Sequence, residues 1–163
     1  MIWKFLDTIK NKILIPFKII PRQGLSSNKL ALSFTIGIIA GSFPVIGLTS
    51  VVSLIFLVLL KQNFTIVQAM NWVVAPIQLL MIIPFMRLGA IVLFKDNLSI
   101  TLGNIIKAFE PGLWEGLKTV GLLHVYAALG WTIIAIPAGI VMYYLFFLLF
   151  RYLRLMKQAG KAV

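Results

Sequence analysis

Three long apolar blocks without a charged residue constrain what this chain can fold into. They are Leu30–Leu60, Gln62–Met86 and Thr119–Phe150, and only His124 in the third can acquire a charge near neutral pH. A helix needs about 20 apolar residues to cross the hydrocarbon core of a bilayer. Each block therefore predicts a membrane segment, and the chain predicts an all-α integral membrane protein built as a helical bundle.

Charge composition narrows the partners that the chain can have. It contains 15 Lys and Arg residues against 4 Asp and Glu, and charged residues make up only 12%, whereas soluble domains carry about 25%. The basic residues cluster at the two ends and between the apolar blocks, and they do not form a stripe on a soluble module. This distribution favours the lipid bilayer over nucleic acid as the partner.

Patterns that carry catalysis or bind metals are missing from the sequence. The four acids, Asp7, Asp96, Glu110 and Glu115, all lie outside the apolar blocks, and there is no cysteine. A single histidine cannot form a metal site alone, and no HExxH motif occurs. We therefore expect no enzyme activity, no bound metal and no cofactor.

The chain is expected to form one membrane domain over residues 1–163. Its parts are a basic amphipathic cytoplasmic segment at 1–29, a broken helical hairpin at 30–60, a transmembrane helix at 62–94, a polar interfacial connection at 95–118, a transmembrane helix at 119–150 and a basic cytoplasmic tail at 151–163. Apolar residues keep rough helical spacing in the connection, which predicts a short interfacial helix broken at Pro111-Gly112.

The first 29 residues combine apolar side chains at helical spacing with a basic polar face, interrupted at Pro16. Such a segment is suited to lying on an anionic membrane surface. An alternative interpretation is a plain juxtamembrane segment that follows the positive-inside rule. The candidate contacts with anionic lipid are Lys4, Lys10, Lys12 and Lys18.

Both ends of the chain are basic, so the positive-inside rule places both in the cytoplasm. That requires an even number of crossings, although there are three blocks. Leu30–Leu60 is the best candidate for a helical hairpin, either tight or re-entrant, because residues that break helices cluster in its middle. Three alternatives stay open: a hairpin in the third block bent at Pro137 and Gly139, hairpins in both the first and the third block, or a break in Gln62–Phe94 at Pro76 or Pro84.

The order of these helix breakers resembles a known family. Gly37, Gly41, Pro44 and Gly47 are followed by K-Q-N-F-T at 61–65, Asn71, A-P-I-Q at 75–78 and P-F-M-R-L-G at 84–89. Over residues 25–94 this order is similar to the bacterial domain of unknown function 2062. Many members carry Asn-Pro-x-Thr where this chain has Ala75 and Gln78. The resemblance implies a prokaryotic membrane protein and implies no activity.

Candidate residues for binding a substrate or lipid come from the breakers and from polar residues in the second block. Each has a second, structural interpretation: Gly37 and Gly41 form a G-x-x-x-G that suits close helix packing, the polar amides suit hydrogen bonds between helices, and Arg87 suits an interfacial position. The candidates are Gly37, Gly41, Pro44, Gly47, Asn71, Pro76, Gln78 and Arg87.

Two function classes fit these features. The first is a small transporter or a translocase for a lipid headgroup or lipid carrier, because broken helices at membrane depth are typical of transport sites. The second is a membrane scaffold or accessory subunit that binds anionic lipid or a partner protein. The expected location is the bacterial inner membrane, as a multi-pass protein with both termini cytoplasmic. Because the chain is small, a homo-oligomer is expected.

Overall fold

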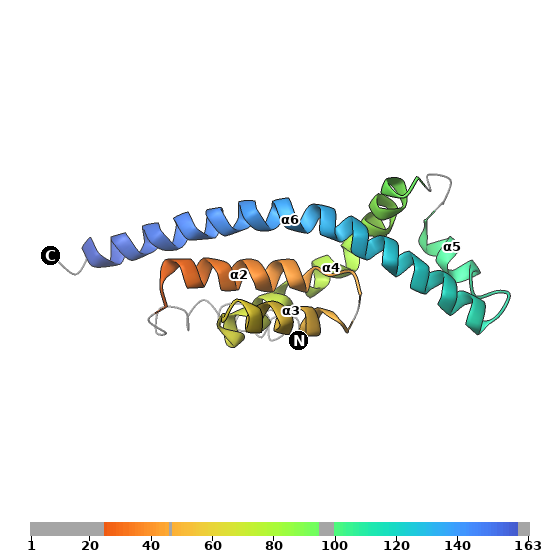
Figure 1. Cartoon of the computed structure of the whole chain (residues 1–163), viewed down its shortest axis with the longest axis horizontal. Coiled ribbons are helices and arrows are strands. Elements are labelled where there is room, and N and C mark those ends of the chain that lie inside the picture. Colours follow the sequence, from red (N-terminus) through yellow and green to blue (C-terminus); the bar gives the residue numbers. More distant parts are fainter. Residues whose placement is uncertain (1–24, 46, 95–99, 160–163) are drawn as a thin grey trace, which may run out of the picture.

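The computed structural model describes residues 25–45, 47–94 and 100–159. These ranges contain helices and no strand, which confirms the predicted all-α class. The predictions for Lys4, Lys10, Lys12 and Lys18 lie outside the described residues. The helices, labelled as in Figure 1, are α2 (Ser27–Gly41), α3 (Thr49–Leu59), α4 (Phe64–Val92), α5 (Leu102–Lys107) and α6 (Leu113–Ala159).

Helices α2 and α3 form the broken hairpin that the breakers predict. The Ser26 side chain caps α2 by accepting a hydrogen bond from the amide of Lys29 at 3.3 Å. The chain then turns after Gly41, and Gly47 adopts a φ of +88°, a conformation that only glycine reaches without strain. After this turn α3 runs back alongside α2 (Figure 1).

Helix α4 continues through both of its prolines, so the alternative break in the second block does not form. Its 29 residues include Pro76 and Pro84, each of which removes one backbone hydrogen bond. The Asn63 side chain caps its start by accepting from the amide of Ile66 at 3.1 Å. At 1.5 Å per residue, α4 is about 43 Å long.

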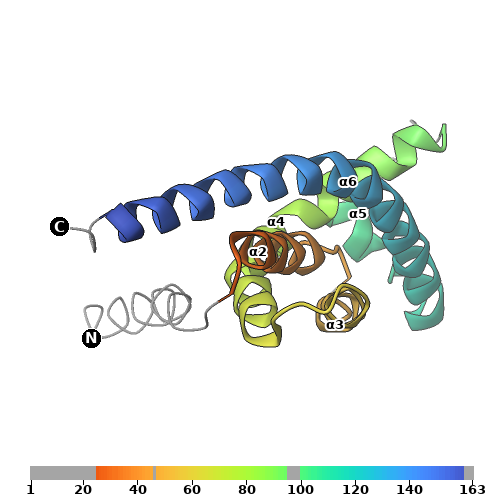
Figure 2. The same ribbon diagram turned by 60° about the vertical axis from the view of Figure 1, so that its left-hand side comes forward.

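Helix α6 extends beyond both ends of Thr119–Phe150, the apolar block that predicted it. It begins directly after the break at Pro111-Gly112, where Gly112 has a φ of +151°, and it continues through Arg151 and Arg154 to Ala159. Its 47 residues include Pro137 without reversing direction, so the alternative hairpin in the third block does not form. Figure 2 shows α6 as one curved helix.

The predicted interfacial helix is shorter than its apolar spacing suggested, because α5 ends at Lys107.

Two apolar clusters hold α6 against the other helices. In one, Phe34 of α2 packs against the Phe146 and Phe150 rings of α6, at centroid distances of 5.4 and 5.0 Å. In the other, Phe85 and Met86 of α4 pack with residues of α6 that include Tyr126 and Trp131. Figure 1 shows α6 passing over α2 and crossing α4.

Two glycines allow the close crossing of α4 and α6. A Cβ atom at Gly89 would overlap the backbone carbonyl of Tyr126, and one at Gly130 would lie 2.9 Å from the amide nitrogen of Gly89 and overlap the carbonyl of Phe85. Contacts between helix backbones at this range require residues without side chains. The crossing therefore depends on both glycines.

Within the part of the chain that the structure describes, two helices are long and apolar enough to cross a membrane, judged by length and composition: Phe64–Val92 and the part of α6 from Leu113 to Met156. Only 33% and 11% of the most apolar windows of these helices are buried within the fold. A buried core helix of a soluble protein would hide most of such a surface. Here large apolar side chains such as Trp72 and Leu80 point outward, at 77% and 73% exposed.

Candidate functional site

The turn between α2 and α3 docks on the middle of α4. The Gln78 side chain donates a hydrogen bond from Nε2 to the carbonyl oxygen of Phe43 at 2.9 Å, and Gln78 is only 6% exposed. Gln78 is the central residue of α4, whose bounds are Phe64 and Val92. The bond therefore places Phe43, at the tip of the hairpin, beside the middle residue of α4.

Helix α6 holds the same turn from another direction. The indole Nε1 of Trp131 donates to the Ser42 hydroxyl oxygen at 3.1 Å, and that hydroxyl donates in turn to the carbonyl of Ile39 at 2.7 Å. The Phe43 ring meets the Trp131 ring edge to face, with centroids 5.1 Å apart. Sequence analysis missed Ser42 and Trp131, since 89 residues separate them and neither belongs to a motif.

The two glycines of the G-x-x-x-G pattern lie flat against α4. A Cβ atom at Gly37 would be 2.5 Å from Cβ of Met70, and one at Gly41 would be 2.9 Å from Cα of Asn71. Real Cβ atoms do not approach other atoms this closely. The two helices can therefore come this close only because positions 37 and 41 are glycines, which have no side chain. The contact leaves no room for a ligand between the two helices at this level.

Asn71 lies in this contact and uses little of its hydrogen-bonding capacity. It is 5% exposed, and its Nδ2 donates to the Gln68 side chain at the long distance of 3.5 Å. An amide side chain offers two donors and two acceptor lone pairs. With Gln68, Asn71 and Gln78, α4 therefore presents a row of amides at helical spacing. Of these, Gln78 makes a short bond to the turn between α2 and α3.

The far side of the turn is open. Pro44 is completely buried, whereas Gly47 and Leu48 are exposed and a Cβ atom at Gly47 would meet nothing within 4 Å. Leu48 precedes the first residue of α3 and gives that helix no side-chain cap. Within α3, the hydroxyl of Ser53 is fully buried and has no hydrogen-bond partner. The irregular backbone is thus packed on one side and uncovered on the other.

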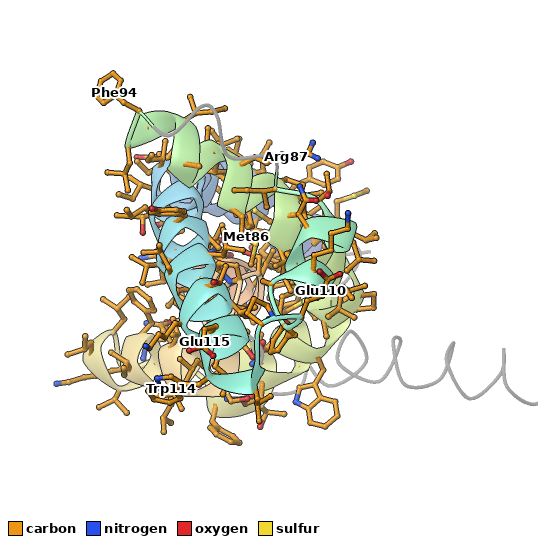
Figure 3. The ribbon with its side chains drawn as sticks, turned by 90° about the vertical axis from the view of Figure 1, so that its right-hand side faces the viewer. Met86, Arg87, Phe94, Glu110, Trp114 and Glu115 are labelled. Carbon is orange, nitrogen blue, oxygen red and sulfur yellow. The ribbon has the colours of Figure 1, made fainter. Side chains whose placement is uncertain are left out.

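Two of the candidate residues lie away from the turn. Pro76 is exposed on the outer surface of α4. Arg87 lies nine residues beyond Gln78, a rise of about 13 Å along α4, and donates from Nε to the carbonyl of Ile100 at 3.0 Å. Figure 3 shows Arg87 beside α5. The fold thus gathers Gly37, Gly41, Pro44, Asn71 and Gln78 around the hairpin and leaves Pro76 and Arg87 outside that group.

Comparison with known proteins identifies one family. The model of a family described as an uncharacterized protein conserved in bacteria (DUF2062) matches residues 17–159. The match extends beyond the stretch whose breakers resembled that family and includes all the described helices. No curated protein and no solved structure matches the chain.

Proposed function

Since the chain belongs to the DUF2062 family of uncharacterized bacterial proteins, we propose that it is a bacterial inner-membrane protein that translocates lipid headgroups along a re-entrant hairpin. Helices α4 and α6 each cross the bilayer once in this proposal. Helices α2 and α3 enter from the cytoplasmic side and return to it. The bond from Gln78 to the Phe43 carbonyl is the observation that carries the proposal.

Helix lengths support the re-entrant path. The 15 residues of α2 and the 11 residues of α3 correspond to about 22 and 16 Å at 1.5 Å per residue, whereas the hydrocarbon core is about 30 Å thick. Neither helix is long enough to cross, but α4 and α6 are. A re-entrant hairpin followed by two crossings leaves the start of α2 and the end of α6 on the same side of the membrane.

The positions of the basic residues support the proposal that α2 and α3 enter from the cytoplasmic side. The start of α2, the end of α3, the start of α4 and the end of α6 all lie at the same end of the bundle (Figure 1). Lys29, Lys61, Arg151 and Arg154 are exposed in these segments. Lysine and arginine accumulate on cytoplasmic flanks, so this end is assigned to the cytoplasm.

The depth of the hairpin tip supports a transport role. Because Gln78 is central in α4, a spanning α4 would carry the Phe43 carbonyl near the midplane of the bilayer. Irregular backbone is tolerated there only when it is packed in protein or faces a wet cavity. The row of amides on α4 and the indole of Trp131 provide hydrogen-bonding groups at that depth, where polar groups usually mark substrate paths.

One observation favours the second function class, a scaffold. Gly37 and Gly41 pack against α4 without leaving space, and such a contact serves a rigid hairpin as well as a moving one. The two classes differ in whether lipid moves, so a transport measurement separates them.

The topology is tested by single cysteines in this naturally cysteine-free chain. We expect Lys107→Cys to react with a membrane-impermeant thiol reagent on intact spheroplasts, and Lys61→Cys and Arg151→Cys to react only after permeabilisation. Labelling of Lys61→Cys from outside would mean that the hairpin crosses the bilayer, and the re-entrant proposal would be wrong.

Translocation is tested in proteoliposomes that contain a headgroup-labelled fluorescent phospholipid and are treated with an impermeant quencher. The wild-type protein should expose label from the inner leaflet. Gln78→Leu and Asn71→Ala should slow this exposure by up to about tenfold, since one lost hydrogen bond contributes about 0.5–1.5 kcal/mol. Thr132→Val is the control, because that exposed hydroxyl bonds only the carbonyl of Ala128 in its own helix.

Two outcomes would contradict a translocase. Wild-type vesicles could lose no more label than protein-free vesicles, which would leave the scaffold. Alternatively, Thr132→Val could slow the exposure as much as Gln78→Leu does, which would remove the role of the hairpin tip.

A further inference from the structure

The cytoplasmic end of the bundle carries positive charge that no described acid balances. Lys29, Lys61, Arg151 and Arg154 are exposed there, while the described acids, Glu110 and Glu115, lie at the other end, where α5 meets α6 (Figure 3). Along α6, 36 residues separate Glu115 from Arg151, a rise of about 54 Å. That separation exceeds the Debye length of about 8 Å at physiological ionic strength several times, so the acids do not neutralise this end.

Specific contacts hold the segments that carry these cations together. The Arg154 guanidinium donates from Nη2 to the carbonyl of Leu25 at 2.5 Å, which joins the end of α6 to the chain that enters α2. The Ser33 hydroxyl of α2 donates to the Gln62 side chain at 3.3 Å and accepts from the amide of Asn63 at 3.3 Å. These bonds join the loop that contains Lys61 to α2. The three segments that carry the four cations are therefore tied to one another at this end of the bundle.

The chemistry of this surface fits an anionic headgroup. Lysine and arginine carry charge toward phosphate, and the planar guanidinium offers paired donors to phosphate oxygens. Tyr152 is exposed beside Arg151, and tyrosine is enriched at the level of the headgroups. At the opposite end the described acids, Glu110 and Glu115, are accompanied by Arg87, Lys107 and Lys118, so three cations face two acids there and four cations face no described acid at the cytoplasmic end.

We propose that Lys29, Lys61, Arg151 and Arg154 form a binding surface for the phosphate groups of anionic phospholipids in the cytoplasmic leaflet. The inference rests on the membrane orientation of the proposed function and not on lipid movement. It adds a lipid class, and it assigns the recognition to folded residues at the ends of α2, α3 and α6.

The test uses the full chain in nanodiscs that contain phosphatidylglycerol and phosphatidylcholine, with the retained lipids measured by native mass spectrometry. Lys61→Gln and Arg151→Gln should each lower the preference for phosphatidylglycerol about fivefold, and the double variant about 25-fold. The matched control is Lys107→Gln with Lys118→Gln, which removes the same charge from the opposite end and should leave the preference unchanged. Circular dichroism of each variant checks that the helices remain.

Three results would overturn the inference. The basic-end variants could retain phosphatidylglycerol as the wild type does, or the control pair could lose as much preference. Inorganic phosphate could displace the lipid at equal concentration, which would identify a site for a free anion. Because the readout is binding, a chain that retains phosphatidylglycerol but moves no lipid would contradict the translocase and leave this surface standing.

Discussion

Gly89→Ala and Gly130→Ala are expected to lower the thermal midpoint of the purified protein by about 6–12 °C. Each new Cβ atom would meet backbone atoms of the opposite helix, at the carbonyl of Tyr126 or of Phe85. Overpacking of this kind costs up to about 3 kcal/mol, and for a chain of this size 1 kcal/mol shifts the midpoint by about 2–4 °C. Backbone atoms cannot rotate away as side chains can, so α4 and α6 must separate.

Gly121→Ala provides the matched control in the same helix. Gly121 lies in α6, is exposed, and a Cβ atom there would meet nothing within 4 Å. Replacing a helical glycine with alanine at such a site stabilises by about 0.5–1 kcal/mol. Differential scanning fluorimetry in detergent should therefore separate the three variants. An equal loss for Gly121→Ala would mean that the close crossing is not the cause.

Gly37→Ala and Gly41→Ala are expected to release the hairpin from α4 while α4 and α6 stay together. The added Cβ atoms would lie 2.5 Å from Cβ of Met70 and 2.9 Å from Cα of Asn71. Val67→Cys on α4 reports whether the hairpin has separated from α4. Val67 is 0% exposed, and its backbone carbonyl would lie 2.6 Å from a Cβ atom at Gly37. Overpacking by about 3 kcal/mol would speed thiol labelling of this cysteine about 100-fold, since each 1.4 kcal/mol is tenfold in an equilibrium constant.

Gly139→Ala in α6 is the control for this experiment. A Cβ atom at Gly139 would lie 3.6 Å from Cγ1 of Ile39, an ordinary van der Waals contact. Labelling of Val67→Cys should stay slow in that background. If Gly37→Ala and Gly41→Ala also leave the labelling slow, the hairpin tolerates separation at this level and the docking described here is wrong.

The hairpin itself could be predicted because its cause is local. Gly41, Pro44 and Gly47 lie within seven residues of one another, and Gly47 supplies the positive φ that the turn requires. The same reasoning left Pro76, Pro84 and Pro137 as alternative breaks, and there the helices continue. A proline removes only one backbone bond, so whether a helix stops at it depends on what packs around it. The four acids outside the apolar blocks and the basic ends were also evident from the sequence.

The tertiary contacts of the candidate residues, unlike the hairpin, could not be predicted from the sequence. Gln78 was a candidate as a polar residue in an apolar block, but its partner is the backbone carbonyl of Phe43, which has no sequence signature. The role of Gly89 and Gly130 in the helix crossing was not predicted, since neither shares a motif with the residue it faces. Arg87 was a candidate as the arginine that follows the second apolar block, but the rise of α4 carries it about 13 Å beyond Gln78, away from the turn.

By itself, the sequence determined the helical class, the apolar lengths of the two long helices and the break at Pro44 to Gly47, because each follows from the backbone preferences and hydropathy of neighbouring residues. Only the tertiary structure decided where the hairpin docks and at what height, because hydrogen bonds such as Trp131 to Ser42 join residues far apart in the chain. It also decided that Gly37 and Gly41 serve contact between helices. A glycine permits both a turn and a close approach, and only the neighbouring helix selects between them.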